Sequence, residues 1–165
     1  MHAALRPEGT RTYRKRLCTL LGLPEGATEM QIHSLIMSGL PAQILVELCE
    51  LGAILPRERD WIVPPRSLRR RAGAGHRLTV EESDKLFRVV HVTALAETII
   101  GGRETARRWL EKPQVQFNER APLDMLTTTA GMWAVEKCLL HVAECAQKRP
   151  VSQASAVSAE AGAGP

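Results

Sequence analysis

Apolar residues recur at helical spacing along the first third of the chain, interrupted by glycine and proline. The first ten residues contain Pro7 and are expected to form a loose arm. A short basic helix is predicted over residues 12–21, and two amphipathic helices over residues 28–39 and 41–52. Because no run of alternating β-branched residues persists for four positions, strands are not expected. The pattern therefore predicts an all-α fold.

Two sequence signatures mark where helices begin. Thr28 and Gln31 have the spacing of a capping box, in which the two side chains satisfy the first free amides of a helix. Thr79 and Glu82 repeat this spacing before a long apolar run. The helix that begins there is expected to end at Gly101 and Gly102.

The middle of the chain has the pattern of a helix-turn-helix. Residues 55–63 and 65–71 predict two short helices separated by Pro64, and the second is rich in arginine. The Gly-Ala-Gly-His stretch over residues 73–76 is the best domain boundary.

The last third of the chain predicts a more compact helical arrangement. A helix over residues 103–112 ends before Pro113, a tight helical turn covers residues 122–126, and a final helix covers residues 131–147. The apolar stripe expected on this final helix consists of Met132, Val135, Leu139, Val142 and Ala146. We predict that Trp61 and Trp109 pack in the core, whereas Trp133 lies off the stripe and is a candidate for a protein interface.

These elements divide the chain into three parts. Residues 1–77 are expected to form a helix-turn-helix domain for DNA binding and dimerisation, and residues 78–149 a small helical domain. Residues 150–165 contain no aromatic side chain and are expected to be disordered.

Positive charge is concentrated in the first part. Residues 1–77 carry 12 basic and 7 acidic side chains, whereas residues 78–165 carry 10 and 11. The candidate DNA-binding residues are those of the arginine-rich helix: Arg66, Ser67, Arg69, Arg70 and Arg71. A solvated basic face, or one that contacts an acidic protein, would have the same composition.

The sequence contains no set of residues that indicates catalysis or a cofactor. The five histidines form no cluster, and no phosphate-binding glycine motif occurs. The four cysteines lack zinc-ligand spacing and are expected to be reduced, so no metal site is predicted. Because no catalytic set occurs, we expect a protein that is not an enzyme. No apolar stretch is long enough to suggest a membrane span or a signal peptide, so we expect it to be cytoplasmic.

A set of residues in the C-terminal part has a characteristic spacing: Leu78–Leu86, Ala106, Trp109, Leu110, Pro113, Pro122–Leu126, Gly131 and Val135. Through these residues the C-terminal part resembles the toxin-binding domain of the Xre/MbcA/ParS antitoxins, and the residues before it resemble an Xre-like helix-turn-helix more loosely. The resemblance implies an antitoxin of a type II toxin–antitoxin pair. It implies two partners. One is a cognate RES-domain toxin, which acts on NAD. The other is the promoter DNA of its own operon, to which the chain would bind as a dimer or within a larger toxin complex.

The resemblance also implies that the last helix blocks the NAD pocket of the toxin. From their position on its exposed side we expect these residues to contact the toxin: Trp133, Lys137, Leu140, His141, Glu144, Lys148 and Arg149. Two alternatives remain open. In the first, the chain is a stand-alone transcription regulator whose C-terminal domain only dimerises. In the second, it is a helical adaptor whose arginine-rich helix binds a protein.

Overall fold

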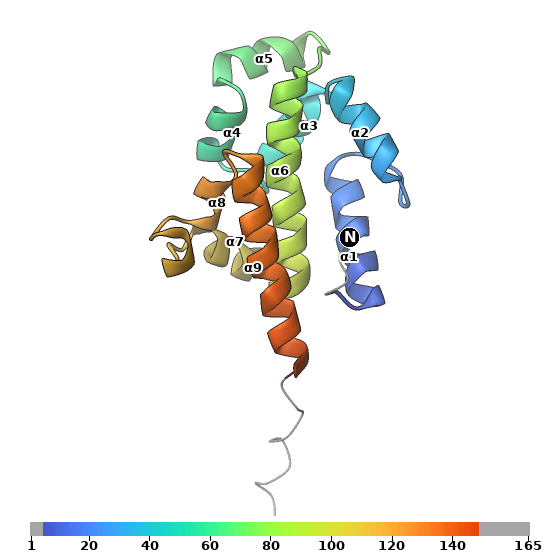
Figure 1. Ribbon diagram of the computed structural model, residues 1–165. Helices are drawn as coiled ribbons and strands as arrows, with labels where there is room; N and C mark the ends of the chain where they lie inside the picture. The colour runs from blue at the N-terminus through green and yellow to red at the C-terminus, as the bar shows by residue number, and fades with distance from the viewer. Residues whose placement is uncertain (1–4, 149–165) are drawn as a thin grey trace, which may run out of the picture.

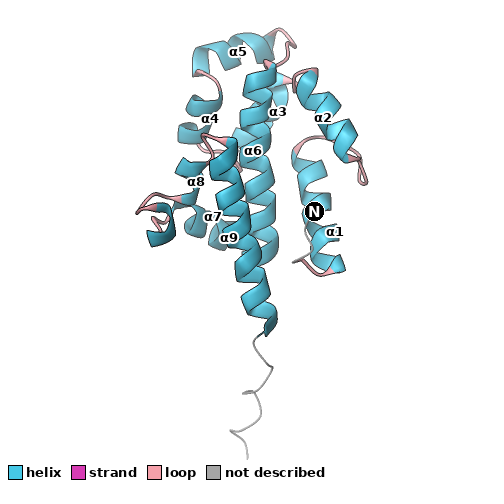
Figure 2. Cartoon of the chain, viewed as in Figure 1, coloured by secondary structure: helices cyan, strands magenta, loops and turns pink. Residues whose placement is uncertain are grey.

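A computed structural model describes residues 5–148 as a set of helices joined by short turns (Figure 1). The α-helices are α1 (Pro7–Leu20), α2 (Glu29–Met37), α3 (Ala42–Glu50), α4 (Pro56–Ile62), α5 (Pro65–Gly73), α6 (Val80–Ala96), α7 (Arg103–Glu111), α8 (Pro122–Met125) and α9 (Thr129–Lys148). Within the described residues no strand forms, and only two isolated bridges pair extended backbone (Figure 2). The predicted all-α class is confirmed. The predicted tail over residues 150–165 lies outside the described residues.

Helix α6 is the centre around which the other helices pack. It contacts α1, α2, α4, α7 and α9 (Figure 1), and ten of its side chains are buried. Its last turn continues as a π-helix over Glu97–Gly101, and Gly102 then takes a positive φ of 77° that ends the element. Because five helices pack against α6, their positions relative to one another depend on their contacts with it.

Both capping boxes form as the spacing predicts. The Thr28 hydroxyl accepts the Gln31 amide at 3.2 Å, and the Gln31 side chain accepts the Thr28 amide at 2.7 Å. Thr79 and Glu82 make the same reciprocal pair at 3.2 and 2.8 Å. Helices α2 and α6 therefore begin where local chemistry dictates.

The expectation of a loose arm over the first ten residues is wrong for its second half, because α1 begins at Pro7. Proline is favoured in the first turn of a helix, where its missing amide would have no partner. Pro7 therefore starts the helix, and the Thr12 hydroxyl donates to the Glu8 carbonyl one turn later at 2.9 Å.

A backbone clamp ties the turn between α2 and α3 to the start of α6. The Leu78 amide donates to the Leu40 carbonyl, and the Leu40 amide donates to the buried Ser83 hydroxyl, both at 2.8 Å. Gly39 has a φ of +79°, and a Cβ at this position would lie 2.3 Å from the Leu78 carbonyl oxygen. Only glycine fits here, because both the conformation and the close approach exclude a side chain.

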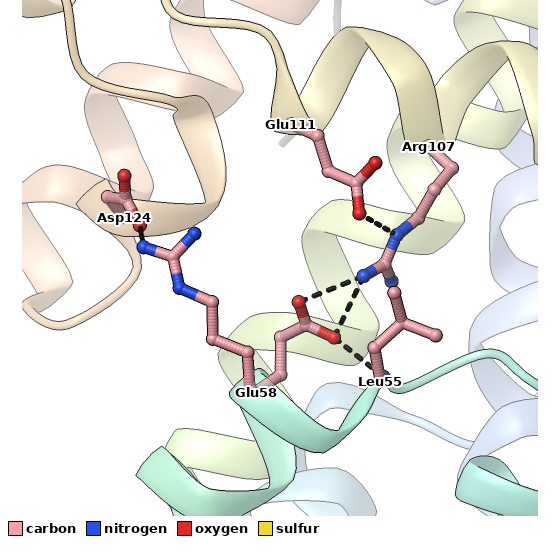
Figure 3. A network of polar contacts seen from close by, with 6 residues as sticks. Leu55, Glu58, Arg107, Glu111 and Asp124 are labelled. Carbon is pink, nitrogen blue, oxygen red and sulfur yellow. Dashed lines mark hydrogen bonds and ion pairs between the residues drawn. The ribbon is translucent and has the colours of Figure 1, made fainter.

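A partly buried ion pair joins α4 to α7 (Figure 3). Arg107 donates to both carboxylate oxygens of Glu58 at 2.9 and 3.1 Å, and its Nε donates to Glu111 at 2.8 Å. Glu58 also accepts the Leu55 amide at 2.7 Å, so it caps α4 while it holds α7. Beside this network, Arg57 on α4 pairs with Asp124 on α8.

The predicted apolar stripe of the final helix is correct in its first half and wrong in its second. Met132, Val135 and Leu139 are buried, and Ala143 continues the stripe at a step of four. Val142 is 37% exposed, and Ala146 is also exposed. Val142 lies beside the line that the buried positions 132, 135, 139 and 143 follow, so it faces away from the core. Ala146 lies in the last turn of α9, and Figure 1 shows that α9 extends past the end of α6.

Across residues 5–148, no helix combines the length and the apolar character required to cross a lipid bilayer.

Candidate partner-binding surfaces

The start of α9 is fixed by a close contact with α8. Gly131 packs so tightly that a Cβ would lie 1.9 Å from the Met125 carbonyl oxygen. The Thr128 hydroxyl accepts the Gly131 amide at 3.0 Å and so satisfies one of the free amides of the first turn. The Pro-Leu-Asp-Met turn and Gly131 thereby set the position of the last helix.

Five of the seven residues predicted to contact a toxin lie along one side of α9. With Glu136 they line a shallow hollow of about 360 Å³, which is formed by Trp133, Glu136, Lys137, Leu140, His141 and Glu144. We call this the α9 face. The side chain of Lys148, at the end of α9, and Arg149 lie outside the described residues.

Apolar and charged groups alternate along the α9 face. Trp133 is 62% exposed, as the sequence predicted, and Leu140 is half-buried. At the far end, His141 Nδ1 lies 4.0 Å from a Glu144 carboxylate oxygen. An exposed aromatic beside charged groups is typical of a surface that binds another protein.

The arginine-rich helix α5 presents a second surface. Pro65 occupies its first turn, and Leu68 is only 4% exposed and packs inward. Arg66, Arg69 and Arg70 are exposed, whereas Ser67 is half-buried. The structure thus places three arginines on the outside of one short helix.

Arg71 has a different environment from the other arginines of α5. Its guanidinium pairs with the Glu82 carboxylate at the first turn of α6, where both side chains are largely buried. Burial alone would raise the pKa of Glu82, but the hydrogen bonds from the Thr79 amide and from Arg71 outweigh it and hold the pKa below its ordinary value. Arg71 therefore anchors α5 to α6, and its contact with DNA stays a prediction.

The two tryptophans predicted for the core lie at its edge. Trp61 and Trp109 are half-buried and pack against the main apolar cluster. The Arg88 guanidinium lies 5.7 Å from the centre of the Trp61 ring, a cation–π distance.

Sequence reasoning missed a cluster of polar side chains behind Trp133. Tyr13 from α1, His91 from α6 and Glu136 from α9 meet beside a groove that Trp133 also lines. These residues are separated by 78 and 45 positions, and no local motif links them. Only the packing of α1 and α9 on α6 brings them together. Among the described residues, no group of three or more potential metal ligands occurs.

Comparisons with known proteins agree with one another, one over residues 95–143 and two over most of the chain. Residues 95–143 match the family described as the antitoxin Xre/MbcA/ParS C-terminal toxin-binding domain. A Pseudomonas putida protein named antitoxin Xre is 46% identical over 140 residues, which cover 85% of this chain and 88% of that protein. A Yersinia enterocolitica protein of the same name is 30% identical over 131 residues, which cover 77% and 86% respectively.

Proposed function

The chain belongs to the Xre antitoxin family, and from that premise we propose that it neutralises a cognate toxin by covering the toxin's active site with the α9 face. We propose further that the toxin has a RES domain and consumes NAD or transfers its ADP-ribose.

The α9 face is the observation that carries this proposal. It lies within residues 129–148, so most of it falls inside the region that matches the toxin-binding family. It combines an exposed indole with Lys137 and Glu144, and protein interfaces favour such aromatic anchors ringed by polar groups. No other described helix exposes a tryptophan to this extent.

The proposed mechanism is steric and electrostatic. A pocket that holds the pyrophosphate of NAD is expected to be cationic. Glu144, an exposed acidic group of the α9 face, would occupy that positive region in place of a phosphate, while Leu140 would exclude water beside it. The dinucleotide and α9 would then compete for the same space.

Co-expression with the product of the neighbouring gene tests this proposal. We expect a stable complex that suppresses NAD loss. The double substitution Leu140→Arg with Glu144→Arg should abolish both effects, because it removes the apolar group of the half-buried Leu140 and reverses the charge of the exposed Glu144. Thermal unfolding of the variant checks that its fold is retained. Unchanged binding by this variant would contradict the assignment of the α9 face.

A matched control exists at the end of α3. Leu51 is 63% exposed and Glu50 is exposed, and neither lines the α9 face. The double substitution Leu51→Arg with Glu50→Arg makes the same chemical change and should leave toxin binding unaltered.

We also propose that α4 and α5 act as a helix-turn-helix that represses the operon, with the chain bound to DNA as a dimer. Arg66, Arg69 and Arg70 would contact phosphates and base edges from α5. Replacing all three by glutamine should weaken binding to the promoter duplex and flatten its dependence on salt, since each lost phosphate contact reduces the salt slope.

A stand-alone transcription regulator is the second candidate, and the exposed arginines of α5 are the observation that favours it. In that case the chain would bind its promoter with a steep salt dependence, yet form no complex with the neighbouring gene product. The C-terminal half would then serve dimerisation alone. Measuring both activities on the same preparation separates the two functions.

A further inference from the structure

A groove lies between α1, α2 and α9 on the surface of α6. Its volume is about 350 Å³, within the range of sites that hold small ligands. Its apolar walls are formed by Leu17, Ile32, Ile36, Phe87, Met132 and Trp133. Figure 1 shows α1 and α2 on one side of α6, with α9 lying along another. We call this hollow the α1–α9 groove.

Three polar side chains that line the groove are engaged with one another. The Tyr13 hydroxyl lies 2.7 Å from His91 Nδ1, and His91 Nε2 lies 3.6 Å from a Glu136 carboxylate oxygen. Phe87 stacks on the His91 ring with centroids 5.7 Å apart, and each of the three polar groups has further interactions within the chain. These polar groups thus hold α1, α6 and α9 together and are not counted as binding groups for a partner.

The charged groups where α1 meets α2 are also paired. Arg14 Nη1 lies 2.6 Å from a Glu29 carboxylate oxygen, and the Arg14 guanidinium also donates to the Ala27 carbonyl. The two opposite charges compensate each other at this rim of the groove. What the groove presents to a partner is therefore apolar surface.

Part of that apolar surface is accessible to solvent. Trp133 is 62% exposed, and Ile36 and Phe87 are half-buried although they line the same hollow. Apolar surface that a partner removes from water stabilises a complex in proportion to the area covered. Aromatic side chains beside a hollow are frequent centres of binding energy in protein interfaces.

The groove is continuous with the region that matches the toxin-binding family. Met132, Trp133 and Glu136 form its α9 side, and all three lie within residues 95–143. Trp133 and Glu136 also line the α9 face. A protein that covers the α9 face therefore lies against the rim of the groove, on the side where Trp133 is exposed.

We propose that the α1–α9 groove receives an apolar side chain of the toxin, which packs between Trp133 on α9 and Ile36 on α2. The apolar walls and the pairing of the charged groups favour an aliphatic or aromatic side chain, because a charge buried here would lose its water without gaining a partner. This inference rests on the proposed antitoxin function. It adds that α1 and α2, which lie outside residues 95–143, form part of the toxin site.

The test places a charge of either sign at the groove and measures the affinity of the full chain for the co-expressed toxin. Thr10 on α1 and His33 on α2 line the groove, and neither belongs to the buried core. We expect Thr10→Lys, Thr10→Glu, His33→Lys and His33→Glu each to weaken binding by about tenfold or more, because each sets a charge against an apolar side chain. If one sign weakened binding and the other strengthened it, the occupant would be charged and the proposal would be overturned.

Matched controls lie on the same two helices. Thr12 on α1 and Ser34 on α2 are exposed and do not line the groove. The same substitutions to lysine and to glutamate at these positions should leave the affinity within about twofold of the parent chain. Thermal unfolding of every variant checks that the fold is retained, and if the variants at one groove position fail to fold, those at the other decide the outcome. An equal loss in the controls would overturn the assignment.

A second copy of the chain is another protein that could cover the groove. Size-exclusion chromatography with light scattering measures the mass of the chain without toxin. We expect the groove variants to have the same mass as the parent. A change of mass in the groove variants but not in the controls would assign the groove to a contact between copies and overturn the proposal.

The outcomes separate this inference from the proposed function. If the Leu140→Arg and Glu144→Arg variant loses the toxin while the groove variants bind normally, the groove assignment is overturned and the antitoxin function stands. If the unmodified chain forms no complex, both proposals fail.

Discussion

Glycine at position 131 is the residue whose role departs most from its usual effect in a helix. Glycine inside a helix ordinarily costs about 1 kcal/mol relative to alanine. Here the Met125 carbonyl oxygen occupies the space where a Cβ would stand. The contact lets the turn between α8 and α9 close, and this turn sets the direction of the α9 face.

Replacing Gly131 by alanine is therefore expected to destabilise the protein, by about 2 kcal/mol or more, because overpacking moves backbone rather than a flexible side chain. Urea unfolding followed by circular dichroism measures the effect. Gly73→Ala is the control, since Gly73 ends α5 with no atom near its would-be Cβ, and we expect no loss of stability there. Equal stability of the two variants would show that the α8–α9 turn tolerates a shift.

Between elements, a few charged contacts connect helices that are distant in sequence. The Glu58–Arg107 pair joins α4 to α7 across 49 positions (Figure 3). Arg71 and Glu82 join α5 to α6. Such pairs orient short helices that have too little apolar surface to fix their own positions.

We expect Arg107→Met to lower the free energy of unfolding by about 3 kcal/mol, because it leaves the Glu58 carboxylate buried without its cation. The neighbouring Arg108 provides the control. Its side chain is 71% exposed and contacts the exposed Glu104, so Arg108→Met should change stability by less than about 0.5 kcal/mol. A similar effect of both substitutions would mean that water reaches Glu58.

The Arg71–Glu82 pair predicts a dependence of stability on pH. The pKa of Glu82 lies below its ordinary value of 4.5 in the folded chain. Its contribution is therefore complete above pH 4.5 and is lost as the pH falls through the lower, folded pKa. Glu82→Gln should be less stable than the parent at neutral pH, and the difference should shrink in acid.

Unfolding measured between pH 7 and pH 3 tests this expectation. Glu81→Gln is the comparison, because the Glu81 side chain is 78% exposed and pairs with Lys85 one turn along α6 at 2.8 Å. It should show a smaller difference at neutral pH. A difference for Glu82→Gln that stayed constant down to pH 3 would contradict the role of its charge.

Across the whole molecule, the apolar core is continuous. One cluster of buried side chains runs from Tyr13 in α1 to Leu139 in α9. Helix α6 begins just after the predicted boundary at residue 77, yet it packs against α1, α2 and α4 as well as α7 and α9. The division into domains 1–77 and 78–149 remains a prediction, and its physical test is cooperativity.

We expect the full chain to unfold in one transition, with the same midpoint by tryptophan fluorescence and by circular dichroism. A fragment beginning at Leu78 should not fold, since it would expose the side of α6 that α1 and α2 cover. Two separate transitions, or a stable fragment, would instead support independent domains.

The features that could be predicted from the sequence are those that depend on local chemistry. The helical period, the two capping boxes, the glycines that end helices and the exposure of Trp133 depend on residues within a few positions of one another, so they are readable without the fold. The prediction at Pro7 was wrong for a related reason. Proline ends a helix when it follows one and begins a helix when it occupies the first turn, and the residues around Pro7 do not distinguish the two cases.

Which distant side chains meet depends on the packing of the helices and could not be predicted from the sequence. Nothing near position 71 or position 58 in the sequence indicates Glu82 or Arg107 as a partner. Tyr13, His91 and Glu136 adjoin because three helices pack together. The choice of partner depends on helix packing, which sums many weak contacts over the whole chain, whereas a capping box depends on one turn.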